Sequence, residues 1–201
     1  MDEKTIINLD DSSNRPKPRP LGILHTFYIS GTIEDAKQYN EWFEVIRNAN
    51  ETDIIKLHIN SPGGDLFTAI QFMRVLNESD AVIVASVEGA CMSAATMIFL
   101  CANQFEISEH SMFMFHNYSG IAFGKGGEMY DNITHERKWS EKIMRSVYRD
   151  FLTEEEIKAI LDNKDIWMEG EEVLKRLKNK QKVLEEKRMR KNNGKKPDPK
   201  P

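Results

Sequence analysis

Cysteine is scarce in this chain of 201 residues, which has only Cys91 and Cys101. Neither residue lies in a CxxC pattern, and two cysteines in one apolar stretch do not indicate a disulfide framework. Long hydrophobic runs are also missing, because the uncharged run that begins at Gly89 is too short to cross a membrane. We therefore expect no metal site, no disulfide and no membrane-spanning segment.

Several sequence signals for targeting or nucleotide binding are absent as well. The first twenty residues have neither an apolar stretch nor a cleavage motif of the signal-peptide type. The chain has no P-loop that would bind a nucleotide phosphate. Aromatic residues, which would stack on bases, are missing from the basic sequence KRMRKNNGKKPDPKP at the C-terminus. We expect a cytoplasmic protein that binds no nucleic acid and has no ATPase activity of its own.

Charge and proline divide the chain into three parts. Residues 178–201 contain ten Lys or Arg and three acids, a net +7, whereas the whole chain carries −4, so residues 1–177 carry −11. Pro16, Pro18 and Pro20 alternate with polar residues, which is typical of an extended, poorly ordered segment. We predict a flexible N-terminal arm (1–20), one folded domain (21–178) and a basic C-terminal tail (179–201).

Strand-like and helix-like segments alternate in the first half of this domain. Segments 22–31, 54–59 and 81–87 are rich in β-formers, and the last is apolar throughout, as in a sheet buried on both faces. A helix capped at Thr32 is predicted after the first strand, and another begins near Leu66. The sequence NSPGG (60–64) predicts a turn between them. This alternation predicts an α/β fold with right-handed crossovers.

A long helix is predicted over 128–151, after a glycine-rich loop. Its apolar stripe consists of Met129, Ile133, Ile143, Met144, Val147 and Phe151. The length of this helix indicates that it projects from the domain. Thr153 and Glu156 have the spacing of a capping box, KDIWMEG (164–170) is a short extended segment, and a helix follows from Glu171.

Ser93 is the first candidate for chemistry. It lies in a patch of glycine and alanine, where small side chains would let a substrate backbone approach and a following helix would present N–H groups to an anion. A serine nucleophile also needs a base, a group that orients the base, and amides for the oxyanion. The same patch would suit an ordinary tight helix contact, so both interpretations stay open.

His116 is the candidate base. It ends the alternating run SMFMFH, which predicts a strand that carries the imidazole to the edge of the sheet, where ligands of α/β folds bind. The other histidines are His25, His58, His110 and His135. They have poorer serine settings, since His58 lies inside a strand and His135 lies on the exposed side of a charged helix.

Asp165 is the candidate orienting acid. Because it lies between Lys164 and the apolar pair Ile166 and Trp167, its carboxylate is expected to be partly sheltered. Asp162 is a near competitor.

These motifs together resemble a known family. INSPGG followed by a helix, a glycine with a serine four residues later, and then MFH and KDIWM occur in an order that resembles the proteolytic subunit of the Clp protease, including bacteriophage relatives. The resemblance covers about residues 21–178. It implies that Ser93 is the nucleophile, His116 the base and Asp165 the acid. It also implies that the amides of Gly64 and Ala94 bind the oxyanion, with Gly63 beside them at the substrate-binding strand.

The resemblance further implies a ClpP/crotonase-like spiral of βαβ units. Homo-oligomeric rings would stack through the 128–151 helix, called the handle in this family, and enclose a chamber. The substrate would be an unfolded or threaded polypeptide delivered by an AAA+ unfoldase, with the N-terminal arm as a gate and no cofactor.

The sequence also departs from the family. The family usually has two small residues, then Ser, then Met, whereas ACMSAA places Met92 before the serine and Ala94 after it. Asn117 and Tyr118 follow the histidine, where Gln and Pro are usual. Three alternatives stay open: a catalytically silent ring subunit, a capsid maturation protease, and a crotonase-type acyl-CoA enzyme.

Overall fold

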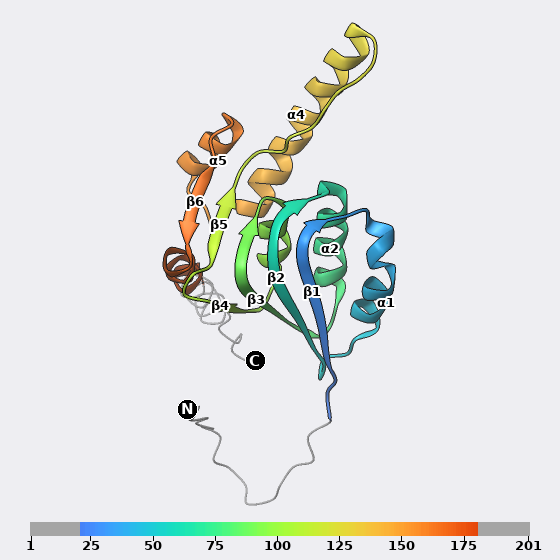
Figure 1. The fold of residues 1–201 in the computed structure, drawn as a ribbon, viewed down its shortest axis with the longest axis vertical. Helices are drawn as coiled ribbons and strands as arrows, with labels where there is room; N and C mark the ends of the chain where they lie inside the picture. Colours follow the sequence, from blue (N-terminus) through green and yellow to red (C-terminus); the bar gives the residue numbers. More distant parts are fainter. Residues whose placement is uncertain (1–20, 181–201) are drawn as a thin grey trace, which may run out of the picture.

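A computed structural model describes residues 21–180 of the chain, and a six-stranded sheet runs through their centre (Figure 1). Its strands are β1 (Leu24–Ile33), β2 (Ile54–Gly64), β3 (Val82–Met92), β4 (Gln104–Ile107), β5 (Met112–Phe115) and β6 (Ile166–Glu169). The predicted arm (1–20) and residues 181–201 of the predicted tail lie outside the described residues.

The first five strands are parallel, and the last is not. β1 pairs with β2 and β2 with β3, and then β4 and β5 pair with two successive parts of β3. β6 pairs antiparallel with β5. The α/β class expected from the sequence is confirmed, and β2 and β3 run several residues further than their apolar cores predicted.

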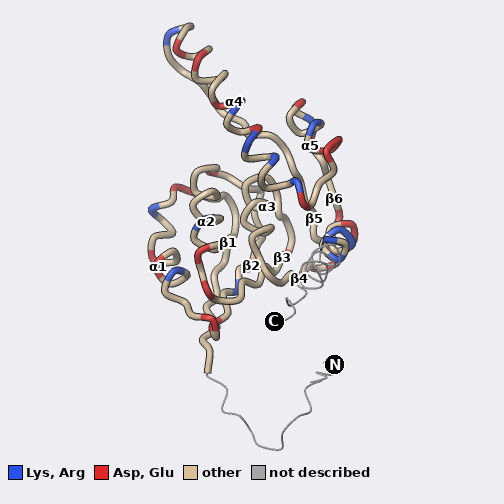
Figure 2. The backbone as a smooth tube through the Cα atoms, turned by 180° about the vertical axis from the view of Figure 1, so that it is seen from behind, with Lys and Arg blue, Asp and Glu red and all other residues tan. Residues whose placement is uncertain are grey.

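Three helices cover one face of the sheet. Seen from behind, α1 (Asn40–Asn48), α2 (Leu66–Glu78) and α3 (Ala94–Phe99) lie in front of the strands (Figure 2). Phe43 of α1 and Phe72 of α2 are completely buried, with ring centroids 4.8 Å apart. Apolar burial between these helices and the sheet forms the hydrophobic core.

The opposite face of the sheet is largely uncovered within residues 21–180. Burial alternates along β1 and β2, and Tyr28, on the uncovered face, is 60% exposed. The expectation of a sheet buried on both faces is therefore wrong for β1 and β2. It holds only for residues 83–87 of β3, which are buried without interruption.

Two local predictions near the ends of β1 and β2 are wrong. Thr32 belongs to β1, and the helical segment after it is capped by Asp35, whose carboxylate accepts the N–H of Lys37 at 3.0 Å and opens the 3-10 turn Ala36–Tyr39. NSPGG is not a turn, because β2 continues through Gly64 beside β1. The proline and glycines of this segment suggested that β2 ends there, but the pairing of Gly64 with Ile33 of β1 keeps the segment extended.

The long helix α4 (Gly126–Tyr148) projects beyond the sheet, as the sequence predicted (Figure 1). Its two halves differ. Met144 is buried, and Ile143 and Val147 pack against the core, whereas Ile133 is 50% exposed. One end of the predicted apolar stripe therefore packs on the domain core, and the other end is exposed.

The chain then returns to the sheet through α5 (Glu154–Leu161) and β6. The predicted capping box is confirmed: Thr153 Oγ1 accepts the N–H of Glu156 at 3.2 Å, and Glu156 Oε2 accepts the N–H of Thr153 at 2.8 Å. Residues 170–180 form a further helical segment. Between residues 21 and 180, no helix combines the length and apolarity needed to cross a bilayer.

Candidate active site

Ser93 lies at the junction of β3 and α3 in an uncommon backbone conformation. Its φ of 54° and ψ of −126° are rare for a residue with a side chain. Its N–H donates to the carbonyl of Met114 at 2.8 Å, and its carbonyl accepts the N–H and the hydroxyl of Thr96 at 2.9 and 2.7 Å. Contacts to β5 and to α3 thus fix the backbone that carries the hydroxyl.

His116 follows β5 directly and reaches this hydroxyl. The Nε2 atom of His116 lies 2.6 Å from Ser93 Oγ. Residues 90–92 of β3 pair in parallel with residues 112–114 of β5. The residues that follow two adjacent parallel strands lie at the same edge of the sheet, which explains why Ser93 and His116 meet. The structure therefore brings together the serine and the histidine selected from the sequence.

Asp165 precedes β6 and lies on the other side of the imidazole. Its Oδ1 is 3.9 Å from His116 Nδ1, beyond hydrogen-bond distance. Its side chain is 50% exposed, so about half of the Asp165 side chain is sheltered from solvent. The competitor Asp162 caps the end of α5, and no ion pair joins it to His116 among the described residues.

The end of β2 passes very close to Ser93. A methyl group on Gly63 (φ +97°) would lie 2.7 Å from Ser93 Cβ and 3.0 Å from the nitrogen of Ala94. The N–H of Gly63 donates to Ser61 Oγ at 3.1 Å. Gly64 and Ala94 line the same pocket as Ser93 and His116, and the N–H of Ala94 is at the start of α3, where helices have no internal acceptor. Gly63 therefore serves close packing, while Gly64 and Ala94 border the pocket.

The pocket has a volume of about 700 Å³ and also includes residues that the sequence analysis did not select. Phe67 of α2 and Trp139 of α4 line it with their rings stacked at 5.3 Å and 27°. His135, which the sequence places on the exposed side of a charged helix, is exposed but lines the same pocket. A signal for Phe67 was present, because it is an aromatic residue outside the apolar stripe of its helix.

Two buried ionisable groups near the serine stay protonated at neutral pH. Burial strongly raises the pKa of the Cys91 thiol, so this cysteine stays protonated at neutral pH. Burial also raises the pKa of Tyr148, whose hydroxyl lies 2.7 Å from that of Thr96 and ties α4 to the first turn of α3. Over residues 21–180, no three His, Cys, Asp or Glu side chains cluster closely enough to hold a metal ion.

Comparisons with known proteins identify the family of this chain and a solved structure with a similar fold. The Clp protease family model matches residues 26–176. A solved structure of a ClpP1 mutant from Listeria monocytogenes superposes with a TM-score of 0.63 at 21% sequence identity, covering 76% of this chain and 86% of that chain. A comparison with curated proteins gives no match. At this identity the structural likeness establishes the fold alone, whereas the family match spans most of the sequence.

Proposed function

The chain belongs to the Clp protease family, and from this premise we propose that it is a serine endopeptidase with Ser93 as its nucleophile. The observation that carries the proposal is the 2.6 Å contact between Ser93 Oγ and His116 Nε2 at the wall of a pocket. A hydroxyl this close to an imidazole can lose its proton as it attacks a carbonyl carbon.

The proposed reaction proceeds through an acyl-enzyme. His116 Nε2 takes the proton of Ser93 as Oγ attacks the peptide carbonyl, and the amides of Gly64 and Ala94 bind the resulting oxyanion. The imidazolium then protonates the leaving amine as the C–N bond breaks. Water attacks the ester in the second half, with the same histidine as the base.

Asp165 is proposed to hold the Nδ1–H of His116. The 3.9 Å separation must shorten by about 1 Å for a hydrogen bond, a change compatible with the loose geometry of many unliganded sites.

Rings are proposed for this chain because Clp protease family proteins form oligomeric rings. Exposed apolar side chains support the proposal: Ile121 and Phe123 before α4 are 84% and 86% exposed, and Ile133 on α4 is 50% exposed. The contact therefore involves the outer half of α4 and not Ile143 or Val147, which pack on the core. The proposed substrate is an unfolded polypeptide threaded into the chamber by an AAA+ unfoldase.

Labelling by a fluorophosphonate probe tests the proposal. The wild-type protein should be labelled and should hydrolyse short peptides, and Ser93→Ala should do neither while keeping its assembly state. Cys91→Ala is the matched control and should be labelled normally, because the thiol is buried and protonated. Normal hydrolysis by pure Ser93→Ala, or no labelling of the wild type, would refute the assignment. An unlabelled wild-type protein would instead be compatible with the two other interpretations, a catalytically silent ring subunit or a crotonase-type enzyme.

A further inference from the structure

The antiparallel ladder of β5 and β6 ends immediately before the proposed base and its acid. Its last pair is Phe115 with Ile166, and the next residues on the two segments are His116 and Asp165. The Asp165 carboxylate lies 3.9 Å from the imidazole and, within residues 21–180, accepts no hydrogen bond. Its position therefore depends on the backbone that carries it.

A side-chain hydrogen bond joins the same two segments beyond the end of the ladder. Asn117 Nδ2 donates to Asn163 Oδ1 at 3.3 Å. The Oδ1 atom of Asn117 accepts the N–H of Tyr118 at 3.0 Å, so a hydrogen bond within its own segment orients the amide. Asn117 directly follows the proposed base, and Asn163 lies two residues before the proposed acid. The hydrogen bond therefore connects the segment that carries the imidazole to the segment that carries the carboxylate.

Asn163 is itself held by the end of α5. Its φ of 60° is left-handed. Its N–H donates to the carbonyl of Ile160 at 2.9 Å, and the N–H of Lys164 donates to that of Ala159 at 2.9 Å, which is the pattern of a Schellman motif. Glycine is the usual left-handed residue of this motif because it has no Cβ. Asparagine tolerates the same conformation and adds an amide, which here reaches Asn117.

We propose that Asn117 and Asn163 are positioning residues, whose hydrogen bond ties the fixed end of α5 to the histidine segment and keeps the Asp165 carboxylate within reach of His116 Nδ1. The inference rests on the proposed function. Without this hydrogen bond, the segment before Asp165 loses its link to the histidine, and the half-exposed carboxylate turns toward water for more of the time. The imidazole then loses the group that orients it, while the contacts to a bound peptide stay in place. The loss is therefore expected in kcat rather than in KM.

Removal of the amide donor or of its acceptor tests the positioning. Asn117→Ala and Asn163→Gly should each lower kcat for a short peptide by about three- to tenfold with KM nearly unchanged, as expected for one hydrogen bond between neutral amides. Asn163→Gly should keep the thermal stability of the wild type, because glycine suits the left-handed conformation. Asn163→Asp retains an acceptor for the Asn117 amide and should keep most of the rate.

Coupling to Asp165 separates positioning from a general effect on the fold. In an Asp165→Asn protein, Asn117→Ala should lower kcat by less than about twofold further, because the carboxylate that it positions is already gone. Asn48→Ala is the matched control, since the Asn48 amide also donates to an oxygen, the Glu44 carbonyl at 2.7 Å, but within α1, none of whose residues lines the pocket. It should keep the wild-type kcat. Losses that multiply in the double variant, or wild-type kcat in Asn117→Ala and Asn163→Gly, would overturn the inference.

A measurement without hydrolysis separates this inference from the proposed function. In Ser93→Ala, which lacks the proposed nucleophile, Asp165→Asn should shift the Cε1–H resonance of His116, assigned by its loss in His116→Gln. Adding Asn117→Ala should reduce that shift by about half or more. A shift reduced in this way, in a protein whose wild type no fluorophosphonate labels, would reject the nucleophile and keep the positioning. A labelled wild type with no Asp165→Asn shift, or with one that Asn117→Ala leaves unchanged, would keep the nucleophile and reject the positioning.

Discussion

Ser93 and Gly63 are two residues whose backbone conformations depend on each other. Ser93 has a φ of 54°, which costs about 1–3 kcal/mol for such a residue, and hydrogen bonds to Met114 and Thr96 offset this cost. Gly63 lets β2 pass so close that no side chain fits between it and the serine. The position of the hydroxyl is thus set by the neighbouring strand as well as by its own.

Gly63→Ala should therefore damage activity. The added methyl group would lie 2.7 Å from Ser93 Cβ, so either the serine or β2 must move, and we expect the rate of fluorophosphonate labelling to fall by more than about tenfold. Gly31→Ala is the control, because Gly31 also has a positive φ (+75°) but nothing lies within 4 Å of the added methyl. It should lower the free energy of unfolding by about 1–2 kcal/mol with labelling unchanged. Equal labelling of the two variants would contradict the close packing described for Gly63.

Asp165→Asn should lower turnover by about 10²-fold or more, because an amide can hold the imidazole in the wrong tautomer. The measurement is peptide hydrolysis across pH, with thermal unfolding as a check that the fold is kept. Asp162→Asn is the matched change three residues earlier and should leave turnover close to that of the wild type. A larger loss in Asp162→Asn would show that the wrong carboxylate has been assigned.

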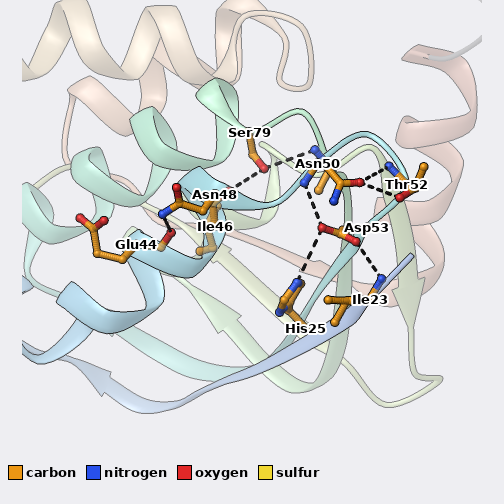
Figure 3. A network of polar contacts seen from close by, with 10 residues as sticks. Ile23, His25, Glu44, Ile46, Asn48, Asn50, Thr52, Asp53 and Ser79 are labelled. Carbon is orange, nitrogen blue, oxygen red and sulfur yellow. Dashed lines mark hydrogen bonds and ion pairs between the residues drawn. The ribbon is translucent and has the colours of Figure 1, made fainter. Parts of the chain in front are cut away.

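Asp53 holds the start of β1 against the turn before β2 (Figure 3). It is 3% exposed, and its carboxylate accepts the N–H of Ile23 at 2.7 Å and that of Asn50 at 3.0 Å, with His25 Nε2 3.9 Å away. These two backbone hydrogen bonds, with a smaller effect of His25, hold the pKa of Asp53 below its ordinary value of 3.8. Ionised Asp53 therefore stabilises the fold.

This pKa shift predicts how stability changes with pH. A carboxyl whose pKa is lowered in the folded state contributes fully above its unfolded pKa, and the contribution disappears as pH falls through the folded pKa. Asp53→Asn should thus be less stable than the wild type near neutral pH, and the difference in free energy of unfolding should shrink below about pH 4. Urea titrations at pH 7 and pH 3 measure it. A difference that is the same at both pH values would mean that charge is not involved.

At the scale of elements, an ion pair connects α5 to the helical segment 170–180. The guanidinium of Arg176 donates two hydrogen bonds to Glu156, at 2.7 and 2.8 Å, and a third to Glu172 at 2.8 Å. The side chains of Arg176 and Glu156 are only 21% and 23% exposed. These hydrogen bonds lower the pKa of Glu156, and the paired geometry is the strongest that arginine forms with a carboxylate.

Arg176→Met should lower the free energy of unfolding by about 1–3 kcal/mol, since it leaves a partly buried carboxylate without its partner. Arg74→Met is the control, because Arg74 pairs with Glu78 within one helix and is 75% exposed. It should cost less than about 0.5 kcal/mol. Urea unfolding measures the free energy of unfolding of both variants. If both lose a similarly small amount, the Arg176–Glu156 pair contributes no more to stability than an exposed surface pair.

At the scale of the whole molecule, the projecting part exposes apolar side chains that the core does not cover. Phe123 precedes α4 and Ile133 lies in its first half, whereas the buried Met144 lies near its other end. The first half of α4 belongs to the part that projects beyond the sheet (Figure 1). Charged residues of both signs are spread along α4 (Figure 2). Such a surface is typical of contact with another protein, and a second copy of this chain is the partner proposed above.

Phe123→Asp combined with Ile133→Asp should therefore reduce the mass of the particle measured by light scattering, with each chain still folded. Ile143→Asp should act differently: because Ile143 packs on the core, it should lower the stability of the individual chain. A monomeric wild-type protein at micromolar concentration would contradict the ring assembly. An unchanged mass in the double variant would place the contact elsewhere.

Much of the fold could be predicted from the sequence because local patterns carry it. Continuous β-forming segments predicted β1, β2 and β3, and the spacing of Thr153 and Glu156 predicted the start of α5. The selection of Ser93 and His116 also came from local cues, a small-residue patch and the end of an alternating strand. These cues act over a few residues, within which backbone sterics and hydrogen bonding are decided by the sequence itself.

Other features depended on residues far apart in the chain. NSPGG looked like a turn, yet β2 stays extended there because Ile33 of another strand pairs with Gly64. Phe67 and Trp139 were not selected from the sequence, yet their rings, from α2 and α4, stack on the wall of the pocket. Local preferences for such backbones and surfaces are worth only about 1 kcal/mol, so contacts between distant segments, which no local pattern contains, determined their final positions.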